Sequence, residues 1–274
     1  MFVSVIIPTY QDWERLDKCL HALRNQSYPK DSFEIIVVNN DVASTPPNPM
    51  PGVKYISEWQ PGSYAARNSG IKIAQGDVIA FTDSDCIPAA DWIASAVAIM
   101  EVENIDRITG PVDIFSEGKS KKLVEAYDRA FAFNQLENVK NGYCVTANLI
   151  VRKRLFEVVG LFDATRMSGG DVAWNKLASS MGLSISYDSN VRVLHPARNT
   201  LKQLLKKAIR VNSSYIDRYG FTWKFVFLNL APPFHLLFRV VKGRNLNPLD
   251  YISFFSVSYI LRLCSLVVLC SQRK

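Results

Sequence analysis

The first half of the chain alternates short apolar runs with segments of helical spacing. Strand-like runs cover residues 3–10, 33–41 and 77–83, and the second is apolar almost throughout, as is typical of a strand buried on both faces. Apolar residues recur every three or four positions over residues 12–26, and a second helix is predicted over residues 63–75. This order predicts βαβ crossovers in a doubly wound α/β domain. Such folds bind their ligands at the carboxyl ends of the strands.

Two carboxylates stand at the end of the third strand. The stretch IAFTDSDCIPAADW begins as a buried strand and then carries Asp83 and Asp85, one residue apart. Two anions at a strand tip repel each other unless a cation lies between them. Oxygen ligands of this kind suit a hard divalent ion, Mg²⁺ or Mn²⁺, shared with a substrate phosphate. The alternative is a solvated turn in which Asp85 or Asp91 caps the next helix.

Five blocks along the chain carry a family resemblance. They are, in order, VSVIIPTYQDWERLDKCLHAL, EIIVVNND, GSYAARNSGIKIAQGDVIAFTDSDCIPAADW, TANLIVRKRLFEVVGLFDATRMSGGDVAWNKLA and VRVLHPARN. Together they closely resemble the family 2 glycosyltransferases over about residues 3–212. The resemblance implies the A-type nucleotide-sugar-binding fold. It also implies the transfer of a sugar, with inversion, from a nucleotide diphosphate sugar, expected to be UDP-linked, to a hydroxyl of a glycan or lipid-linked acceptor.

The resemblance assigns the nucleotide to the ends of the first two strands. Pro8, Thr9, Tyr10 and Asn39 occupy the positions that hold the base in the family. The family often has Asp where this chain has Asn39, so an amide contact replaces a charged one and the choice of nucleotide stays open. Arg67 occupies a position near the base and ribose, and its alternative is an ordinary surface charge on a helix.

The resemblance also assigns the metal and the general base. Asp85 would ligate Mn²⁺ or Mg²⁺, Asp83 would contact ribose or share the ion, and His195 would be a further ligand or a structural histidine. Asp171 is the candidate base that takes the acceptor proton, or else the N-cap of the following helix. Most members read Glu-Asp here and this chain reads Gly170-Asp171, so the acidic neighbour is absent.

Composition and charge indicate the cellular compartment of the protein and the kind of surface that it faces. The chain has 274 residues, 48% of them hydrophobic, and five cysteines without C-x-x-C spacing, so neither a disulfide framework nor a zinc site is indicated. The first residues form a strand pattern and not a secretory leader, and we expect a cytosolic location. Of the net charge of +7, residues 190–274 contribute 14 Lys and Arg against 2 Asp and Glu. The C-terminal third is therefore expected to face something anionic.

Apolar residues in this basic region favour a membrane over nucleic acid. Residues 200–220 form a basic amphipathic pattern, which also fits a surface helix packed on the catalytic domain. Two apolar stretches follow, one split by Pro232 and Pro233 and one carrying Arg262 at its centre. A central Arg costs roughly 2.5–3.5 kcal/mol on insertion, and both flanks of the last stretch are basic. We predict a catalytic domain over residues 1–199 and a helical appendage over 200–274 that lies on the cytoplasmic face without spanning.

Ser258, Arg262 and Ser265 fall on one stripe of the last helix, as expected for a helix that lies in the plane of a membrane. The loop at residues 115–123 is a candidate to close over the acceptor. Two other functions remain open: a silent membrane-bound relative that only binds nucleotide sugars, and a processive polysaccharide synthase. The Q-x-x-R-W motif and the several long spans of the synthases are not found in the sequence.

Overall fold

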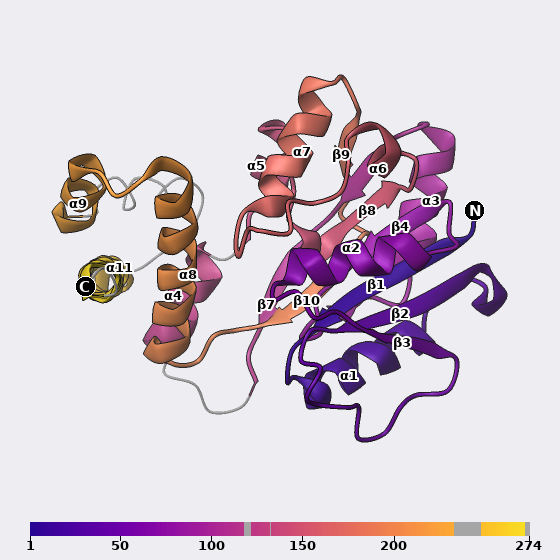
Figure 1. Ribbon diagram of the computed structural model, residues 1–274, viewed down its shortest axis with the longest axis horizontal. Coiled ribbons are helices and arrows are strands. Elements are labelled where there is room, and N and C mark those ends of the chain that lie inside the picture. The colour runs from indigo at the N-terminus through magenta and orange to yellow at the C-terminus, as the bar shows by residue number, and fades with distance from the viewer. Residues whose placement is uncertain (118–121, 132, 233–247, 272–274) are drawn as a thin grey trace. The chain divides into compact units, whose positions relative to one another are not determined.

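The computed structural model describes residues 1–117, 122–131, 133–232 and 248–271 (Figure 1). The chain divides into two compact units. Unit 1 comprises residues 1–113 and 133–195, and unit 2 comprises residues 114–132 and 196–274. The chain therefore leaves unit 1 for unit 2 and returns before it enters unit 2 a second time. The sequence analysis placed one boundary near residue 200, whereas the structure also groups residues 114–132 with the C-terminal region.

Unit 1 is built on a seven-stranded sheet with the order β3-β2-β1-β4-β8-β6-β9. The strands are β1 (Val3–Thr9), β2 (Phe33–Asn39), β3 (Val53–Ser57), β4 (Val78–Phe81), β6 (Arg107–Thr109), β8 (Leu149–Arg152) and β9 (Ile185–Tyr187). Every residue of β1 is buried, and so are the last five of β2, which explains their unbroken apolar runs. The predicted mixed α/β class with a mostly parallel sheet is confirmed.

One strand reverses the direction of the sheet. β1 pairs in parallel with β2 and β4, whereas β8 runs antiparallel to both β4 and β6. Leu149 at the start of β8 lies opposite Phe81 at the end of β4. The segment that enters β8 is therefore brought to the carboxyl end of β4, where the sequence analysis placed the site.

Helices cover both faces of this sheet (Figure 1). They are α1 (Trp13–Arg24), α2 (Ser63–Ile73), α3 (Trp92–Val102), α5 (Gln135–Lys140), α6 (Leu155–Val158) and α7 (Gly170–Ser180). One core layer joins Val5 and Ile7 of β1 to α1 and α3, and the other joins Ile6 to α2, α6 and α7. Successive residues of β1 thus supply opposite layers, as the two-residue period of a strand requires.

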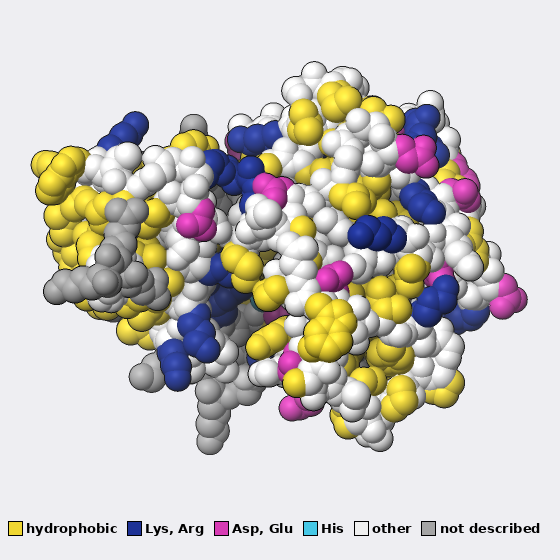
Figure 2. All heavy atoms as spheres, in the orientation of Figure 1, with side chains coloured by type: hydrophobic (Ala, Val, Ile, Leu, Met, Phe, Trp, Pro, Cys, Tyr) yellow, Lys and Arg dark blue, Asp and Glu magenta, His cyan; other side chains and the backbone are white. Residues whose placement is uncertain are grey.

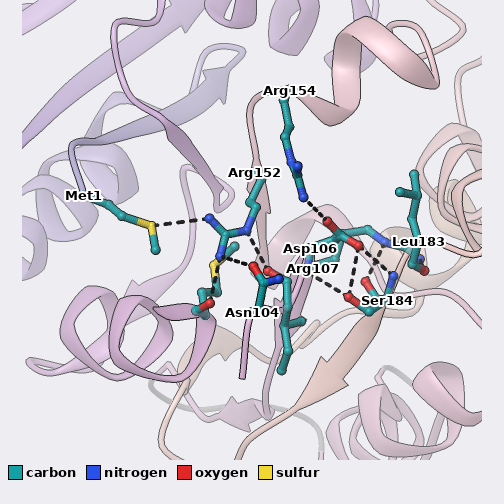
Figure 3. Close-up of polar contacts among 10 residues, drawn as sticks. Met1, Asn104, Asp106, Arg107, Arg152, Arg154, Leu183 and Ser184 are labelled. Atoms are coloured by element: carbon teal, nitrogen blue, oxygen red, sulfur yellow. Dashed lines mark hydrogen bonds and ion pairs between the residues drawn. The ribbon is translucent and has the colours of Figure 1, made fainter. Parts of the chain in front are cut away.

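Buried arginine and aspartate side chains fasten the far edge of the sheet (Figure 3). Arg107 of β6 is fully buried and donates to the carbonyl oxygens of Leu183 and Asn175 at 2.6 and 2.8 Å. Asp106 accepts from the backbone nitrogen and the hydroxyl of Ser184 at 2.9 and 3.0 Å and pairs with Arg154 at 2.9 Å. Because Arg107 holds both α7 and the chain after it, this network fixes the helix that carries Asp171 against the sheet.

A second sheet has three strands in the order β5-β10-β7. These strands are β5 (Ile87–Pro88), β7 (Val112–Phe115) and β10 (Val193–Pro196). β5 belongs to unit 1, and the chain passes into unit 2 within β7 and at the end of β10. The described helices of unit 2 are α4 (Lys122–Phe131), α8 (Leu201–Tyr219), α9 (Trp223–Leu230) and α11 (Pro248–Ser271). α8 begins at a capping box formed by Thr200 and Gln203. Residues 118–121 of the predicted acceptor loop lie outside the described residues.

Unit 2 buries two small apolar clusters together with several polar side chains, and it leaves other apolar side chains exposed. On α11, Ser258 and Ser265 are buried, and Asn212 of α8 donates to Ser265 Oγ at 2.7 Å. Phe227 of α9 and Val267 of α11 are 74% and 67% exposed. Hydrophobic side chains gather over α9 and α11 in Figure 2. Part of the predicted polar stripe of α11 therefore lies against α8, through Ser265.

Residues Phe254–Ser271 form a helix long and apolar enough to cross a membrane, judged by length and composition only. Arg262 at its centre donates to the carbonyl oxygens of Leu228 and Ala231 at 2.9 and 3.3 Å. The guanidinium thus has acceptors within unit 2, which lowers the cost of placing this helix in an apolar environment below that of an isolated arginine.

The five cysteines are divided between the units. Cys19, Cys86 and Cys144 are buried in unit 1, whereas Cys264 and Cys270 are exposed on α11. Burial raises the pKa of each buried thiol, so all three are protonated at neutral pH. All five are free, in agreement with the absence of a disulfide framework in the sequence pattern.

Candidate active site

The carboxyl end of β4 carries the acidic pair. β4 ends at Phe81, and Asp83 and Asp85 follow in a turn that is closed by a backbone bond from Cys86 to the carbonyl of Asp83 at 3.0 Å. Both carboxylates are partly exposed, whereas Cys86 is fully buried. The alternative capping role is not observed for Asp91, which precedes α3 but makes no side-chain hydrogen bond to the helix.

Asp85 and His195 approach each other across this edge. Asp85 Oδ2 lies 3.5 Å from His195 Nε2, and the His195 side chain is only 5% exposed at the end of β10. Neighbouring ligands of a six-coordinate ion with bonds of about 2.1 Å are about 3 Å apart, so this spacing fits a shared ion. Ligand atoms of Asp83, Asp85 and Cys86 also lie within 4.8 Å of one another.

The donor set is one of oxygen and imidazole ligands. Burial and the two neighbouring carboxylates raise the pKa of Cys86 well above its usual value, so a thiolate is not offered at neutral pH. Asp83, Asp85 and His195 remain, and carboxylate-rich sites of this kind suit Mn²⁺ or Mg²⁺ better than softer metals. The residues present therefore fit the predicted ion.

Arg67 holds Asp83 in place. Its guanidinium, in the first turns of α2, is 4% exposed and pairs with Asp83 Oδ1. The surface-charge alternative for Arg67 is wrong, because the side chain lies inside unit 1. Three buried polar atoms near this edge lack a hydrogen-bond partner among the described residues, namely Thr9 Oγ1, Arg67 Nε and Thr82 Oγ1. Each such atom costs about 1–3 kcal/mol unless a ligand or water satisfies it, which is what a binding site leaves for its substrate.

The predicted base-binding residues lie at the ends of β1 and β2. Pro8 and Thr9 are buried in β1, whereas Tyr10 is 62% exposed just beyond it. Asn39 is buried at the end of β2, and its Nδ2 donates to the carbonyl oxygens of Asp41 and Ser44, both at 2.7 Å. Its Oδ1 accepts from the backbone nitrogen of Asp41 at 3.0 Å, so the whole amide is engaged with the following loop and only a second lone pair of the oxygen is left for a base.

Asp171 is the most extensively held carboxylate of the unit. Its Oδ1 accepts from the Tyr64 hydroxyl at 2.8 Å and from the Val172 nitrogen at 2.9 Å. Its Oδ2 accepts from the backbone nitrogen and hydroxyl of Thr146 at 3.1 and 3.4 Å. The alternative that Asp171 is the N-cap of α7 is wrong, because Gly169 takes that position in a left-handed conformation with φ of 71°.

Tyr64 explains the glycine that precedes Asp171. A Cβ at Gly170 would lie 2.8 Å from Tyr64 Cε2, closer than real Cβ contacts. The tyrosine ring therefore occupies the space that a Glu side chain at this position would begin to fill. Because the Tyr64 hydroxyl also donates to Asp171, the missing acidic neighbour is replaced by a neutral donor.

The first turns of α2 join the base candidate to the acidic pair. Tyr64 and Arg67 are three residues apart, so they lie on one face of the helix. The Arg67 guanidinium lies 5.6 Å from the centre of the Tyr64 ring. A continuous series of contacts thus runs from Asp171 through Tyr64 and Arg67 to Asp83. Two predicted residues that are distant in sequence are connected by residues of one helix.

Sequence reasoning missed Tyr64 and Thr146, although both stand inside the quoted blocks GSYAARNSG and TANL. Thr146 belongs to a short 3₁₀ turn, Thr146–Asn148, which leads into β8. Arg198, in the quoted block VRVLHPARN, is from its sequence position a candidate contact for the released diphosphate or part of a solvated basic face. In the structure Arg198 belongs to unit 2 and pairs with Asp128 at 3.0 Å.

The chain is similar in sequence to known proteins. Residues 4–160 match the family model described as glycosyl transferase family 2. Among curated proteins, glycosyltransferase AglE of Haloferax volcanii is 34% identical, over 92% of this chain and 84% of that protein. A Methanococcus voltae protein named as a dolichyl N-acetyl-alpha-D-glucosaminyl phosphate 3-beta-D-2,3-diacetamido-2,3-dideoxy-beta-D-glucuronosyltransferase is 23% identical, over 76% of this chain and 71% of that protein.

Solved structures share the fold. The mannosyltransferase PcManGT from Pyrobaculum calidifontis, in complex with GDP-Man and Mn²⁺, superposes with a TM-score of 0.60 and 19% identity, over 97% of this chain and 86% of that chain. Staphylococcus aureus TarS 1-349 in complex with UDP-GlcNAc superposes with a TM-score of 0.57 and 18% identity, over 96% of this chain and 81% of that chain.

Proposed function

The chain belongs to glycosyl transferase family 2, and from this membership we propose an inverting enzyme that adds one sugar to a hydroxyl acceptor. The donor is a nucleotide diphosphate sugar, UDP-linked, and the acceptor is a glycan or a lipid-linked glycan. The observation that supports the proposal is the contact series from Asp171 to Asp83, in which Tyr64 and Arg67 of α2 connect a candidate base to a candidate metal-binding carboxylate.

Asp83, Asp85 and His195 would hold Mn²⁺ or Mg²⁺, which when bound offsets the charge on the leaving diphosphate. Arg67 fixes the direction of Asp83 from inside unit 1. The exposed ring of Tyr10 is available to stack on the base. The unsatisfied Thr9 Oγ1 is a hydrogen-bond partner for the nucleoside, so binding of the donor would complete the polar contacts of this edge.

Asp171 would act as the base. As the acceptor oxygen forms its bond to the anomeric carbon, the bond from that carbon to the diphosphate oxygen breaks, and its electron pair leaves with the nucleoside diphosphate. The hydroxyl proton moves to an Asp171 oxygen. The weakest of its hydrogen bonds, from the Thr146 hydroxyl at 3.4 Å, is the one to be exchanged for that proton. Attack opposite the leaving group gives inversion.

We place the enzyme on the cytoplasmic face of the membrane. Support comes from the excess of Lys and Arg after residue 190 and from the apolar surface of α9 and α11. The lipid-linked acceptor is supported by this surface and by the dolichyl phosphate in the name of the Methanococcus voltae relative.

The test is a thermal-shift and hydrolysis screen over nucleotide sugars, with and without Mn²⁺, on the native chain and on Asp85→Ala. We expect a UDP-sugar to bind only with the ion, and Asp85→Ala to abolish that binding without unfolding the protein, since the side chain lies at a strand tip. Asp91→Ala is the matched control, because it removes an exposed carboxylate nearby that makes no capping bond.

Unchanged Mn²⁺-dependent affinity in Asp85→Ala would refute the metal site. Donor binding without hydrolysis or transfer would favour a silent relative. Repeated addition of sugars to one acceptor would favour a processive synthase.

A further inference from the structure

The backbone of Asp171 is fixed, but its carboxylate can turn. The Asp171 carbonyl oxygen accepts from Asn175 Nδ2 at 3.0 Å, and Asn175 Oδ1 accepts from Arg107 Nη1 at 2.9 Å, so the first turn of α7 is tied to the sheet. The last torsion of an aspartate side chain has a broad, two-fold preference and does not distinguish the two carboxylate oxygens. Which oxygen faces a substrate is therefore decided by the groups around the carboxylate.

The Asp171 carboxylate accepts about as many hydrogen bonds as it has lone pairs. Tyr64 and Val172 donate to Oδ1, and the backbone nitrogen and the hydroxyl of Thr146 donate to Oδ2. An ionised carboxylate offers about four lone-pair sites, so these donors occupy all of them. One donor must leave before Asp171 can accept a proton from a substrate hydroxyl.

Of the two hydroxyl donors, that of Tyr64 is the more firmly held. Tyr64 is 5% exposed, its ring centre lies 5.8 Å from that of Phe162, and the ring fills the space beside Gly170. Burial and the charge of Asp171 raise the pKa of Tyr64, so the hydroxyl keeps its proton at neutral pH. The Thr146 hydroxyl, in contrast, lies 3.4 Å from Oδ2, beyond the usual range for O–H···O bonds.

We propose that Tyr64 is the positioning residue of the general base: its hydroxyl holds Oδ1, so that Oδ2 receives the acceptor proton. The acceptor hydroxyl then takes the place of the Thr146 hydroxyl at Oδ2. As its oxygen bonds to the anomeric carbon and the diphosphate leaves, its O–H bond breaks and the proton moves to Oδ2, while Tyr64 keeps its own proton. The inference deepens the proposed function and rests on it, because it presumes that Asp171 is the base.

The test measures donor hydrolysis, with water as the acceptor, by the full chain with Mn²⁺. The probes are UDP-Glc, UDP-Gal, UDP-GlcNAc and UDP-GlcA, and the variants are compared on the one that the native chain hydrolyses fastest. Tyr64→Phe keeps the ring and removes the hydroxyl. It should lower kcat at least about tenfold and leave the donor KM unchanged, since misplacement of a reacting group by about 1 Å costs up to about a hundredfold.

Two controls separate positioning from a structural effect. Tyr28→Phe removes a tyrosine hydroxyl that donates to the Met1 carbonyl oxygen at 2.5 Å, before the amino end of β1, and should leave kcat unchanged. Tyr64→Phe added to Asp171→Asn should leave the remaining kcat unchanged, because the hydroxyl acts through the carboxylate. A purely structural effect would be the same with and without the carboxylate.

A further variant tests which oxygen reacts. Thr146→Val removes the hydroxyl donor of Oδ2 and keeps the backbone donor, with a side chain of similar size in the same buried position. Because the Thr146 hydroxyl leaves Oδ2 during the reaction, this change should lower kcat less than Tyr64→Phe does.

The outcomes distinguish this inference from the proposed function. A loss in Asp171→Asn with a normal rate in Tyr64→Phe would overturn the role of Tyr64 alone, and so would equal losses from Tyr64→Phe with and without the Asp171 carboxylate. A larger loss in Thr146→Val than in Tyr64→Phe would make Oδ1 the reacting oxygen and overturn the proposal. A normal rate in Asp171→Asn, or no hydrolysis of any donor by the native chain, would refute the proposed function and this inference with it.

Discussion

Unit 1 and unit 2 both bury apolar clusters, but they differ in the size of the core and in the apolar surface of the helices α9 and α11. In unit 1 the sheet is enclosed by two apolar layers, and buried polar groups are concentrated at one edge or tied into a network. In unit 2 the helices bury Asp128, Ser258 and Ser265 and leave Phe227 and Val267 exposed. An apolar outer face is unfavourable in water, so unit 2 has the surface of a segment that meets another apolar phase.

The difference also changes how a buried charge is interpreted. In unit 1 the Arg67–Asp83 pair is close to buried polar atoms without a hydrogen-bond partner among the described residues, at the end of β4 where we propose that the donor binds. In unit 2 the buried Asp128 pairs with Arg198 and Lys207, both of the same unit. Burial alone does not distinguish the two; the atoms around the charge do.

The largest effect is expected on the turnover of a variant that lacks the Asp171 carboxylate. Asp171→Asn should keep donor binding and lower turnover at least about a hundredfold, the usual scale for loss of a general base. Steady-state rates at saturating donor, with donor affinity measured separately, check this. If turnover is nearly normal, the base lies elsewhere and the buried carboxylate of unit 1 is structural.

The next effect is on the contact between Tyr64 and Gly170. Gly170→Ala should destabilise the fold by about 1–3 kcal/mol, the range for overpacking, because the added methyl meets the Tyr64 ring. Thermal or urea unfolding measures this. Tyr64→Ala/Gly170→Ala should cost less than the two single changes added together, since the ring is gone. Additive costs would place the strain elsewhere.

The smallest effect concerns the outer surface of unit 2. Phe227→Asp should weaken binding to anionic vesicles by about tenfold, because burial of a Phe side chain contributes about 1.5 kcal/mol or more and about 1.4 kcal/mol is a factor of ten. Val102→Asp is the matched control, since Val102 is 86% exposed on α3 of unit 1. Equal flotation of both variants would remove the distinction between the two units.

Much of the fold follows from local pattern. β1, β2 and β4 are continuous apolar runs, and α1 carries Leu16, Leu20 and Leu23 at helical spacing. The reversed β8 and the three-residue strands β6 and β9 were not predicted. Strands this short carry little periodicity, and their pairing depends on contacts between distant parts of the chain.

The residues of the site also include some that the sequence predicts and some that only the structure shows. The sequence motifs predict four side chains of the site, namely Asp83, Asp85, Asp171 and His195. Tyr64 could not be predicted, because it contacts Asp171, which is 107 residues away in the sequence. Lys207 follows Lys206 in the basic pattern of residues 200–220, and only its contact with Asp128 on another helix shows that its side chain is partly buried.

Because the exposed cysteines are confined to α11, this helix can be labelled in the native chain. Cys264 and Cys270 are the exposed thiols, and both belong to α11, so a maleimide label on the folded protein marks that helix without any substitution. They are six residues apart, which is about 9 Å along a helix. A spin label at each position measures the depth of that position in the bilayer, from its accessibility to relaxing agents dissolved in lipid or in water. Similar depths would describe a helix parallel to the bilayer surface, and a difference near 9 Å a helix upright within it.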